Sequence, residues 1–259
     1  MRKKIGTAYM TILFVFLYLP IAIVVLYSFN PSRHMGEMSG FTLSWYRRLF
    51  ENREIAHTLS NSLKLAAISV AASAVIGTLG AVALARRRLR LQGFMEGLVS
   101  IPIMIPEIVL GLSFSAAFTF AGVQLGMGTL VIAHITFCVP YVFIIVKGRI
   151  ASMDPHLEEA ARDLGASPFR VLTDIILPLA APAILAGMLL AFAMSLDDVI
   201  ISFFVTGPGA QTLPLKIFSS LKVGVSPEIN ALCTVMLSVV LVFVTVSQWL
   251  RAKYARETK

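Results

Sequence analysis

Six long apolar runs dominate the pattern of hydrophobic and polar positions along this chain. They lie at about residues 8–29, 59–85, 94–121, 130–146, 179–204 and 229–250. A helix of about 20 largely apolar residues crosses a hydrocarbon core of roughly 30 Å, and the runs do not alternate polar with apolar residues as barrel strands would. A helix also satisfies its own backbone groups within lipid. The pattern therefore predicts an all-α membrane protein with six transmembrane helices, forming a single transmembrane domain over residues 1–259.

Prolines mark the weak points and the ends of these predicted helices. Pro102 and Pro106 interrupt the third run, so we expect that helix to be kinked. The fifth run starts after Pro178 and fades past Phe204, whereas the sixth follows Ser226 and a proline at the first helical position. The first run is too long for the core of a secretory signal and no small-residue cleavage site follows it, which predicts an uncleaved span.

The composition and the placement of basic residues support this topology. Hydrophobic residues make up 57% of the chain, charged residues 14%, and the mean hydropathy is +0.83. With the N-terminus inside, the inner side receives fifteen of the 22 Lys and Arg residues and the outer side seven. Because short cytoplasmic loops carry an excess of Lys and Arg, we expect a multi-pass membrane protein with both termini in the cytoplasm. Basic residues facing anionic membrane lipid account for the net charge of +8 without a nucleic acid partner.

The residues that usually carry chemistry are sparse. The two cysteines lie in or beside apolar runs, where free Cys acts as a small hydrophobe, and the histidines show no ligand spacing. These residues are Cys138, Cys233, His34, His57, His134 and His156. The chain also lacks a phosphate-binding P-loop, a serine nucleophile elbow and a zinc signature. We therefore expect no enzyme activity, no metal site and no cofactor on this chain, and an energy source on another polypeptide.

The connection at residues 148–177 is long and falls on the cytoplasmic side. Asp154 suits the N-cap of a short helix, Pro155 its first position and Gly165 its C-terminal cap. Ser167 and Pro168 then suit the start of a second short helix. Long connections are often functional, although two amphipathic helices lying at the membrane interface would also explain the pattern.

The same connection resembles a known signature. Glu159-Ala160-Ala161, three residues, Gly165, nine residues and then Ile175-x-Leu177-Pro178 are similar to the EAA motif of ABC importer permeases. The resemblance implies that the first helix is a coupling helix that docks into a cleft of the ATP-hydrolysing subunit. It places the ATPase-coupling residues at Glu158, Glu159, Ala160, Ala161, Asp163 and Gly165. Small residues suit a close helix contact.

The resemblance extends over nearly the whole chain and narrows the family. Segments such as Trp45-Tyr46, 134–138, 195–198, 204–208 and 223–231 look like the C-type permease subunit of spermidine/putrescine importers. The resemblance implies transport of polyamines. It also implies four kinds of partner: a second homologous permease in a heterodimer, two copies of an ABC ATPase that bind ATP and Mg, a periplasmic polyamine-binding protein, and membrane lipid.

Three acidic residues lie within the apolar runs. An Asp near the centre of a span costs at least roughly 2.5 kcal/mol on insertion scales, so such groups usually face a cavity or a partner. On a straight helix, Glu107 would lie on the order of 20 Å along the third span, and Asp197 and Asp198 about 27 Å beyond Pro178 in the outer part of the fifth. Carboxylates along one route suit a polycation. Alternatively, they pair with Lys or Arg of the partner permease or cap broken helices, and only one of the adjacent aspartates can point straight into the pathway.

Two aromatic residues mark the first periplasmic loop. Trp45 and Tyr46 could form a wall that holds alkylammonium groups by cation-π attraction, or they could anchor the loop at the membrane interface. The stretch from Leu213 to Val225 could form a short helix at the same outer mouth.

Functions of other classes fit the sequence poorly. A secondary transporter or channel has no use for a docking loop and would often show internal repeats. An intramembrane enzyme needs a nucleophile and base or a metal site. The remaining alternative is an ABC permease for another small organic solute, such as an opine, a different organic cation or an aminophosphonate.

Overall fold

The computed structural model describes residues 2–32, 37–86, 91–222, 224 and 226–257. Helices and turns account for the ordered elements in these ranges, where no strand occurs. The chain divides into two compact units, one of Met1–Ala56 with Ile217–Lys259 and the other of His57–Lys216. The prediction of an all-α protein is confirmed for the described ranges.

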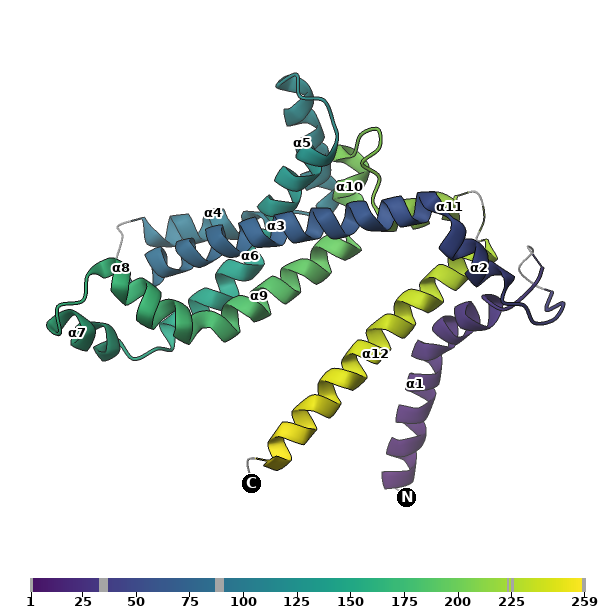
Figure 1. Cartoon of the computed structure of the whole chain (residues 1–259), viewed down its shortest axis with the longest axis horizontal. Coiled ribbons are helices and arrows are strands. Elements are labelled where there is room, and N and C mark those ends of the chain that lie inside the picture. The colour runs from purple at the N-terminus through teal and green to yellow at the C-terminus, as the bar shows by residue number, and fades with distance from the viewer. Residues whose placement is uncertain (1, 33–36, 87–90, 223, 225, 258–259) are drawn as a thin grey trace. The chain divides into compact units, whose positions relative to one another are not determined.

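Helix α6 (Met127–Ala151) forms the centre of the unit His57–Lys216. It packs against α9 (Leu177–Asp197), α4 (Gln92–Met104) and α10 (Ile200–Val205), and Figure 1 shows α6 and α9 side by side. The fully buried side chains of α6 include Leu130, Val142, Val146 and Ile150. The unit therefore has a dense apolar core along the helix that the fourth apolar run predicts.

Glycines allow two helices to approach the middle of α6 closely. Val142 lies between Gly77 of α3 (Arg53–Arg86) and Gly187 of α9. A Cβ atom at Gly77 would lie 2.9 Å from the Cβ of Val142, and a Cβ atom at Gly187 would lie 3.0 Å from its Cα. Larger residues would push the helices apart, as expected for membrane helices whose interfaces use small residues.

The third apolar run does not form one kinked helix. Instead, α4 ends at Met104 and α5 (Glu107–Phe120) begins two residues after Ile105, at an angle of 103° to α4. Figure 1 shows that the two helices run in different directions. Ile105 is extended, with φ −81° and ψ 136°, because the ring of Pro106 disfavours a helical residue before it. The estimate of 20 Å along a straight helix is thus wrong for Glu107, which lies in the first turn of a separate helix.

The fifth apolar run belongs to a longer helix that starts earlier and ends earlier than the sequence suggests. It continues from α8 (Pro168–Arg170) through a π-helical segment, η1 (Val171–Ile176), into α9. Ser167 Oγ accepts a hydrogen bond from the backbone N–H of Arg170 at 3.3 Å, so the expected cap is present, but it begins a 30-residue helix rather than a short one. The helix stops at Asp197, and the short helix α10 follows the break. The connection expected at 148–177 is therefore helical at both ends and contains α7 (His156–Asp163) in its middle.

The other unit contains α1 (Arg2–Tyr27), α2 (Ser44–Glu51) and α12 (Pro227–Glu257), with α12 in contact with both α1 and α2. The cap expected for the sixth run is present, since Ser226 Oγ accepts a hydrogen bond from the N–H of Ile229 and Pro227 is the first helical residue. Asn52, at the end of α2, donates to Glu228 Oε1 at 2.7 Å and ties α2 to the start of α12. Helix α11 (Leu213–Leu221) confirms the short helix expected between residues 213 and 225.

Within the described residues, four helices are long and apolar enough to cross a membrane. They are 9–27 of α1, α3, α6 and the helix 168–197, and the bent pair of α4 and α5 gives a fifth candidate if it is counted as one span. The apolar part of α12 that was searched, Pro227–Val242, is shorter than these. Six spans and cytoplasmic termini therefore stay predictions. Arg87, Arg88 and Arg90, which the sequence assigns to the inner side, lie outside the described residues.

Candidate functional site

Helix α7 carries the EAA segment between two defined caps. Asp154 Oδ1 accepts a hydrogen bond from the N–H of His156 at 3.0 Å, but the N-cap is Pro155 and the helix begins at His156, one residue later than expected. At the other end Gly165 has φ +86°, its N–H donates to the carbonyl of Arg162, and the N–H of Ala166 donates to that of Ala161. These two bonds form a Schellman motif, which requires a left-handed residue and therefore favours glycine. The caps limit α7 to about two turns.

The two adjacent glutamates of α7 face different ways. Glu158 is buried, and its Oε1 lies 2.6 Å from Nε of Arg86 at the end of α3. Glu159 is exposed and contacts His156, whose Nδ1 lies 3.0 Å from Glu159 Oε2. Of the two, Glu158 therefore attaches α7 to its own chain, and Glu159 is available to another one.

The rest of α7 follows the same division. Ala161 packs against the core of the unit, whereas Ala160 and Asp163 are exposed together with Glu159. Leu164, just after the helix, is 90% exposed. The outward face of α7 thus combines a carboxylate pair, a small residue and an apolar side chain, which is a surface suited to a partner protein.

A polar cavity of about 460 Å³ separates α7 from the ends of neighbouring helices. It is lined by Ala85, Arg86, Gln92, Pro155, Glu158, Glu159 and Arg162. Gln92 Nε2 donates to the carbonyl of Leu84 and to Glu96 Oε1, each at 2.9 Å, and Glu96 Oε2 lies 2.6 Å from Lys147 Nζ. These contacts connect α3, α4 and α6 directly beside the attachment of α7. A displacement of α7 would therefore act on α3, α4 and α6, and α4 is the first helix of the bent pair formed with α5.

The break between α9 and α10 separates the two adjacent aspartates. Asp198 is extended, with φ −65° and ψ 123°, and its carboxylate accepts hydrogen bonds from the N–H groups of Ile201 at 3.1 Å and Ser202 at 2.7 Å. It is 8% exposed, whereas Asp197 is exposed. Asp198 thus caps a broken helix, which is one of the alternatives that the sequence leaves open, and Asp197 is the aspartate whose side chain is exposed.

A buried histidine of α6 contacts both helices that flank this break. His134 is fully buried, its Nδ1 lies 2.9 Å from Ser195 Oγ of α9, and its Nε2 lies 3.2 Å from Ser202 Oγ of α10 and 3.5 Å from Asp198 Oδ2. This contact could not be predicted from local patterns, because 61 residues separate His134 from Ser195. Across the described part of the chain, no three His, Cys, Asp or Glu side chains are placed to hold a metal ion.

Glu107 lies on a helix that packs against α10. A Cβ atom at Gly111, one turn after Glu107 on α5, would lie 2.7 Å from Phe204 Cδ2, so the glycine permits close contact with α10. Glu107 itself is exposed. The exposed carboxylates of Glu107 and Asp197 thus lie on helices that meet through α10, in the same packed unit.

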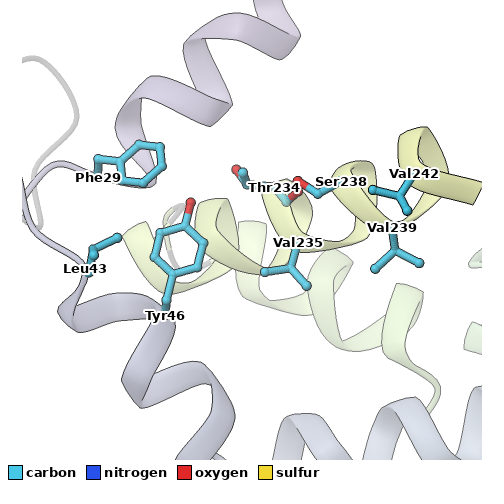
Figure 2. Close-up of a pocket in the computed structure, with 8 residues that line it drawn as sticks. All are labelled: Phe29, Leu43, Tyr46, Thr234, Val235, Ser238, Val239 and Val242. Carbon is cyan, nitrogen blue, oxygen red and sulfur yellow. Dashed lines mark hydrogen bonds between the residues drawn. The ribbon is translucent and has the colours of Figure 1, made fainter. Parts of the chain in front are cut away.

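Trp45 and Tyr46 occupy different environments on α2. Trp45 is 6% exposed, its indole N–H donates to the carbonyl of Asn30 at 2.8 Å, and the guanidinium of Arg48 lies 5.0 Å from its ring centroid. These contacts hold Trp45 within its own unit. Tyr46 points its hydroxyl into an apolar cavity of about 730 Å³ (Figure 2). The hydroxyl oxygen of Tyr46 lies 2.6 Å from Ser28 Oγ. The remaining lining residues are Phe29, Leu43, Thr234, Val235, Ser238, Val239 and Val242.

A helical membrane protein with a capped EAA helix and a broken span has the features of an importer permease. The family model for binding-protein-dependent transport system inner membrane components matches residues 74–259, and the chain belongs to this family. It is therefore a transport component and a multi-pass membrane protein.

The chain is also similar to individual permease proteins. The chain is 46% identical to the spermidine/putrescine transport system permease protein PotC of Escherichia coli (strain K12), over 93% of this chain and 91% of that protein. It is 42% identical to the protein of the same name from Haemophilus influenzae, over 97% and 98% of the two chains. It is 39% identical to the putrescine transport system permease protein PotI of Escherichia coli (strain K12), over 94% and 89%.

Solved structures share the fold at low sequence identity. A chain of the crystal structure of a bacterial ABC transporter involved in import of the acidic polysaccharide alginate has a TM-score of 0.74 at 18% identity, covering 95% of both chains. A chain of the MetNI methionine ABC transporter in an inward-facing conformation has a TM-score of 0.62 at 16% identity, covering 82% of this chain and 99% of that one. The architecture is therefore that of ABC importer permeases.

Proposed function

We propose that this chain is one permease subunit of an ABC importer that moves the polyamines spermidine and putrescine across the bacterial inner membrane. The observation that carries the proposal is the 46% identity, over 93% of the chain, to a spermidine/putrescine permease. The six apolar runs and the distribution of Lys and Arg support six spans with both termini in the cytoplasm.

The chain would work within a larger assembly. Its partners would be a second, homologous permease, two copies of an ATPase that bind ATP and Mg, and a periplasmic binding protein that delivers the polyamine. In support, one solved relative of the fold is described as a complex of the alginate transporter with an alginate-bound periplasmic protein. The chain itself would bind no nucleotide.

Helix α7 would transmit ATP binding and hydrolysis to the spans. Its exposed residues Glu159, Ala160 and Asp163 would contact the ATPase, while the ion pair of Glu158 with Arg86 transfers the movement of α7 to α3. Gly165 would end the helix so that it fits the ATPase cleft. A helix fixed at one buried ion pair and two caps moves as a rigid body, which suits a coupling element.

The acidic residues would select for charge along the passage. Glu107 and Asp197 would each receive an ammonium group as the polyamine loses water, with Asp198 holding the break beside them. Carboxylates in a low-dielectric passage attract cations strongly and repel anions. Trp45 and Tyr46 would shape the outer mouth, where Tyr46 offers an aromatic face to the alkylammonium chain.

The experiment that tests this function is uptake by cells that lack their own polyamine transport and synthesis. The chain is produced with its partner permease, ATPase and binding protein, and accumulation of labelled spermidine and putrescine is measured. Excess unlabelled polyamine should abolish accumulation, whereas an opine, a quaternary ammonium compound and an aminophosphonate should not compete. Stronger competition by one of these solutes than by either polyamine would assign the importer to that solute instead.

A further inference from the structure

The break between α9 and α10 is held by a single buried side chain of a third helix. The imidazole of His134 contacts Ser195, in the last turn of α9, through Nδ1 and Ser202, in the first turn of α10, through Nε2. One ring therefore bridges both sides of the break. Its exposed fraction is 0%, which gives it no direct access to a solute.

The bridge fixes the carboxylates around the break. Asp198 Oδ2 lies 3.5 Å from His134 Nε2 and accepts the N–H of Ser202, so Asp198 is held from two sides. Asp197, the preceding residue, is the last residue of α9 and is exposed. The contacts of Ser195 and Asp198 with His134 stabilise the end of α9 in the orientation that leaves Asp197 exposed.

Helix α10 is attached to α6 at its far end as well. Thr129 Oγ1 of α6 donates to the carbonyl of Val205 at 2.8 Å, where both groups are buried. The same short helix packs its Phe204 and Ile201 against Gly111 of α5, the helix that begins with Glu107. His134 thus contacts α10, the helix that follows Asp197 in the chain and packs against the helix of Glu107.

We infer that His134 is a positioning residue of the polyamine pathway, which acts through the α9–α10 break to hold Asp197 in register with Glu107. The inference rests on the proposed function, because it assigns His134 an effect on substrate selection and not only on folding. A side chain that merely fills the core would leave the preference between two polyamines unchanged. A positioning residue would alter that preference in the same direction as loss of the Asp197 charge.

A double-mutant cycle of His134→Leu and Asp197→Asn tests the inference in the assembled transporter. Uptake of spermidine and putrescine is measured per complex recovered from membranes. We expect each single change to lower spermidine uptake about tenfold and to reduce the ratio of spermidine to putrescine uptake. In the Asp197→Asn background, His134→Leu should cost less than about twofold more. The cycle isolates coupling because removing the positioned group removes the benefit of positioning it.

Two further variants complete the test. His134→Gln, which offers an amide near the position of Nε2, should restore most of the uptake and the ratio. Cys138→Ala, one turn later on α6 and also buried against α9, should leave the ratio unchanged. Losses that multiply in the double mutant, or a leucine variant whose uptake falls only with the amount of complex and whose ratio is unchanged, would overturn the inference. An Asp197→Asn transporter with normal spermidine uptake would instead refute the proposed pathway itself.

Discussion

Two pairs of adjacent acidic residues show that neighbours of the same type have different roles in this chain. The contacts of each carboxylate determine its role. The carboxylate of Asp198 accepts hydrogen bonds from two backbone N–H groups of α10, whereas Asp197 is exposed. Glu158 is bound to Arg86, whereas Glu159 is exposed. In each pair one acid stabilises the chain and the other is available to a solute or a partner.

Neutralising the exposed acids should change transport according to the charge of the substrate. Glu107→Gln and Asp197→Asn keep the shape of the side chain and remove its charge, so each should weaken an ammonium contact by about 1.5 kcal/mol. This corresponds to roughly a tenfold slower uptake. The loss should be larger for spermidine, a triamine, than for putrescine, a diamine, because more of its charge would travel unpaired.

The control for this prediction is the amount of assembled complex. If Glu107 or Asp197 pairs with a cation of the partner permease, its neutralisation leaves that cation unpaired and should reduce assembly. Uptake of both polyamines would then fall equally and in proportion to the complex recovered, which would contradict a pathway role for that residue.

At the scale of elements, the ion pair of Glu158 with Arg86 attaches the coupling helix to α3. Breaking a largely buried pair by removing one partner costs on the order of 3 kcal/mol, so Glu158→Gln should loosen α7 and lower ATP hydrolysis stimulated by the loaded binding protein. Exchanging the charges by Glu158→Arg with Arg86→Glu should restore part of it. Glu159→Gln is the matched comparison, and it should lower stimulated hydrolysis without a partner substitution at Arg86 that rescues it. A charge exchange with no rescue would contradict the attachment.

The end of the coupling helix depends on backbone conformation. Among the residues that the structure describes, none beyond the two chain neighbours lies within 4 Å of a Cβ placed at Gly165, but the φ of +86° disfavours most side chains by roughly 1–2 kcal/mol. Gly165→Leu should therefore reduce stimulated ATP hydrolysis severalfold, whereas Gly165→Asn should retain most of it, because Asn tolerates this conformation. Hydrolysis in the leucine variant equal to that of the original chain would show that the cap has no part in coupling.

Local patterns predict elements well where the cause is local. The caps at Ser167 and Ser226 follow from short-range chemistry and both are present, and the start of α7 lies within one residue of the expected position after Asp154. The 103° bend at Pro106 was expected only as a kink, because a proline ends a helix but does not set the direction of the next one.

Contacts between distant parts of the chain could not be predicted in the same way. His134 meets Ser195 and Asp198 across more than 60 residues, and Arg86 meets Glu158 across a comparable distance. A helical pattern shows that Glu158 and Glu159 face different ways, but which of them faces inward depends on how α7 packs against α3. The sequence therefore predicts which residues belong to the candidate site better than it predicts which of them are buried and which are exposed.

At the scale of the whole molecule, the topology can be tested by labelling. Single cysteines at Met38 and Phe169, 58% and 72% exposed, are introduced by Met38→Cys and Phe169→Cys in a chain lacking Cys138 and Cys233. A membrane-impermeant maleimide should label the first from the periplasm and the second only after access to the cytoplasm, as the distribution of Lys and Arg requires. Labelling from the opposite sides would reverse the orientation and remove α7 from the reach of an ATPase.

The central claim is that this chain is the membrane passage of an ATP-driven polyamine importer. The most direct test is accumulation of labelled spermidine in vesicles that contain the chain, its partner permease and the ATPase, with ATP and Mg inside and the loaded binding protein outside. We predict accumulation above the external concentration that requires both ATP and the binding protein, and that is lost when the ATPase partner cannot hydrolyse ATP. Accumulation that persists without ATP and follows an ion gradient would contradict the account and would make the chain a secondary transporter.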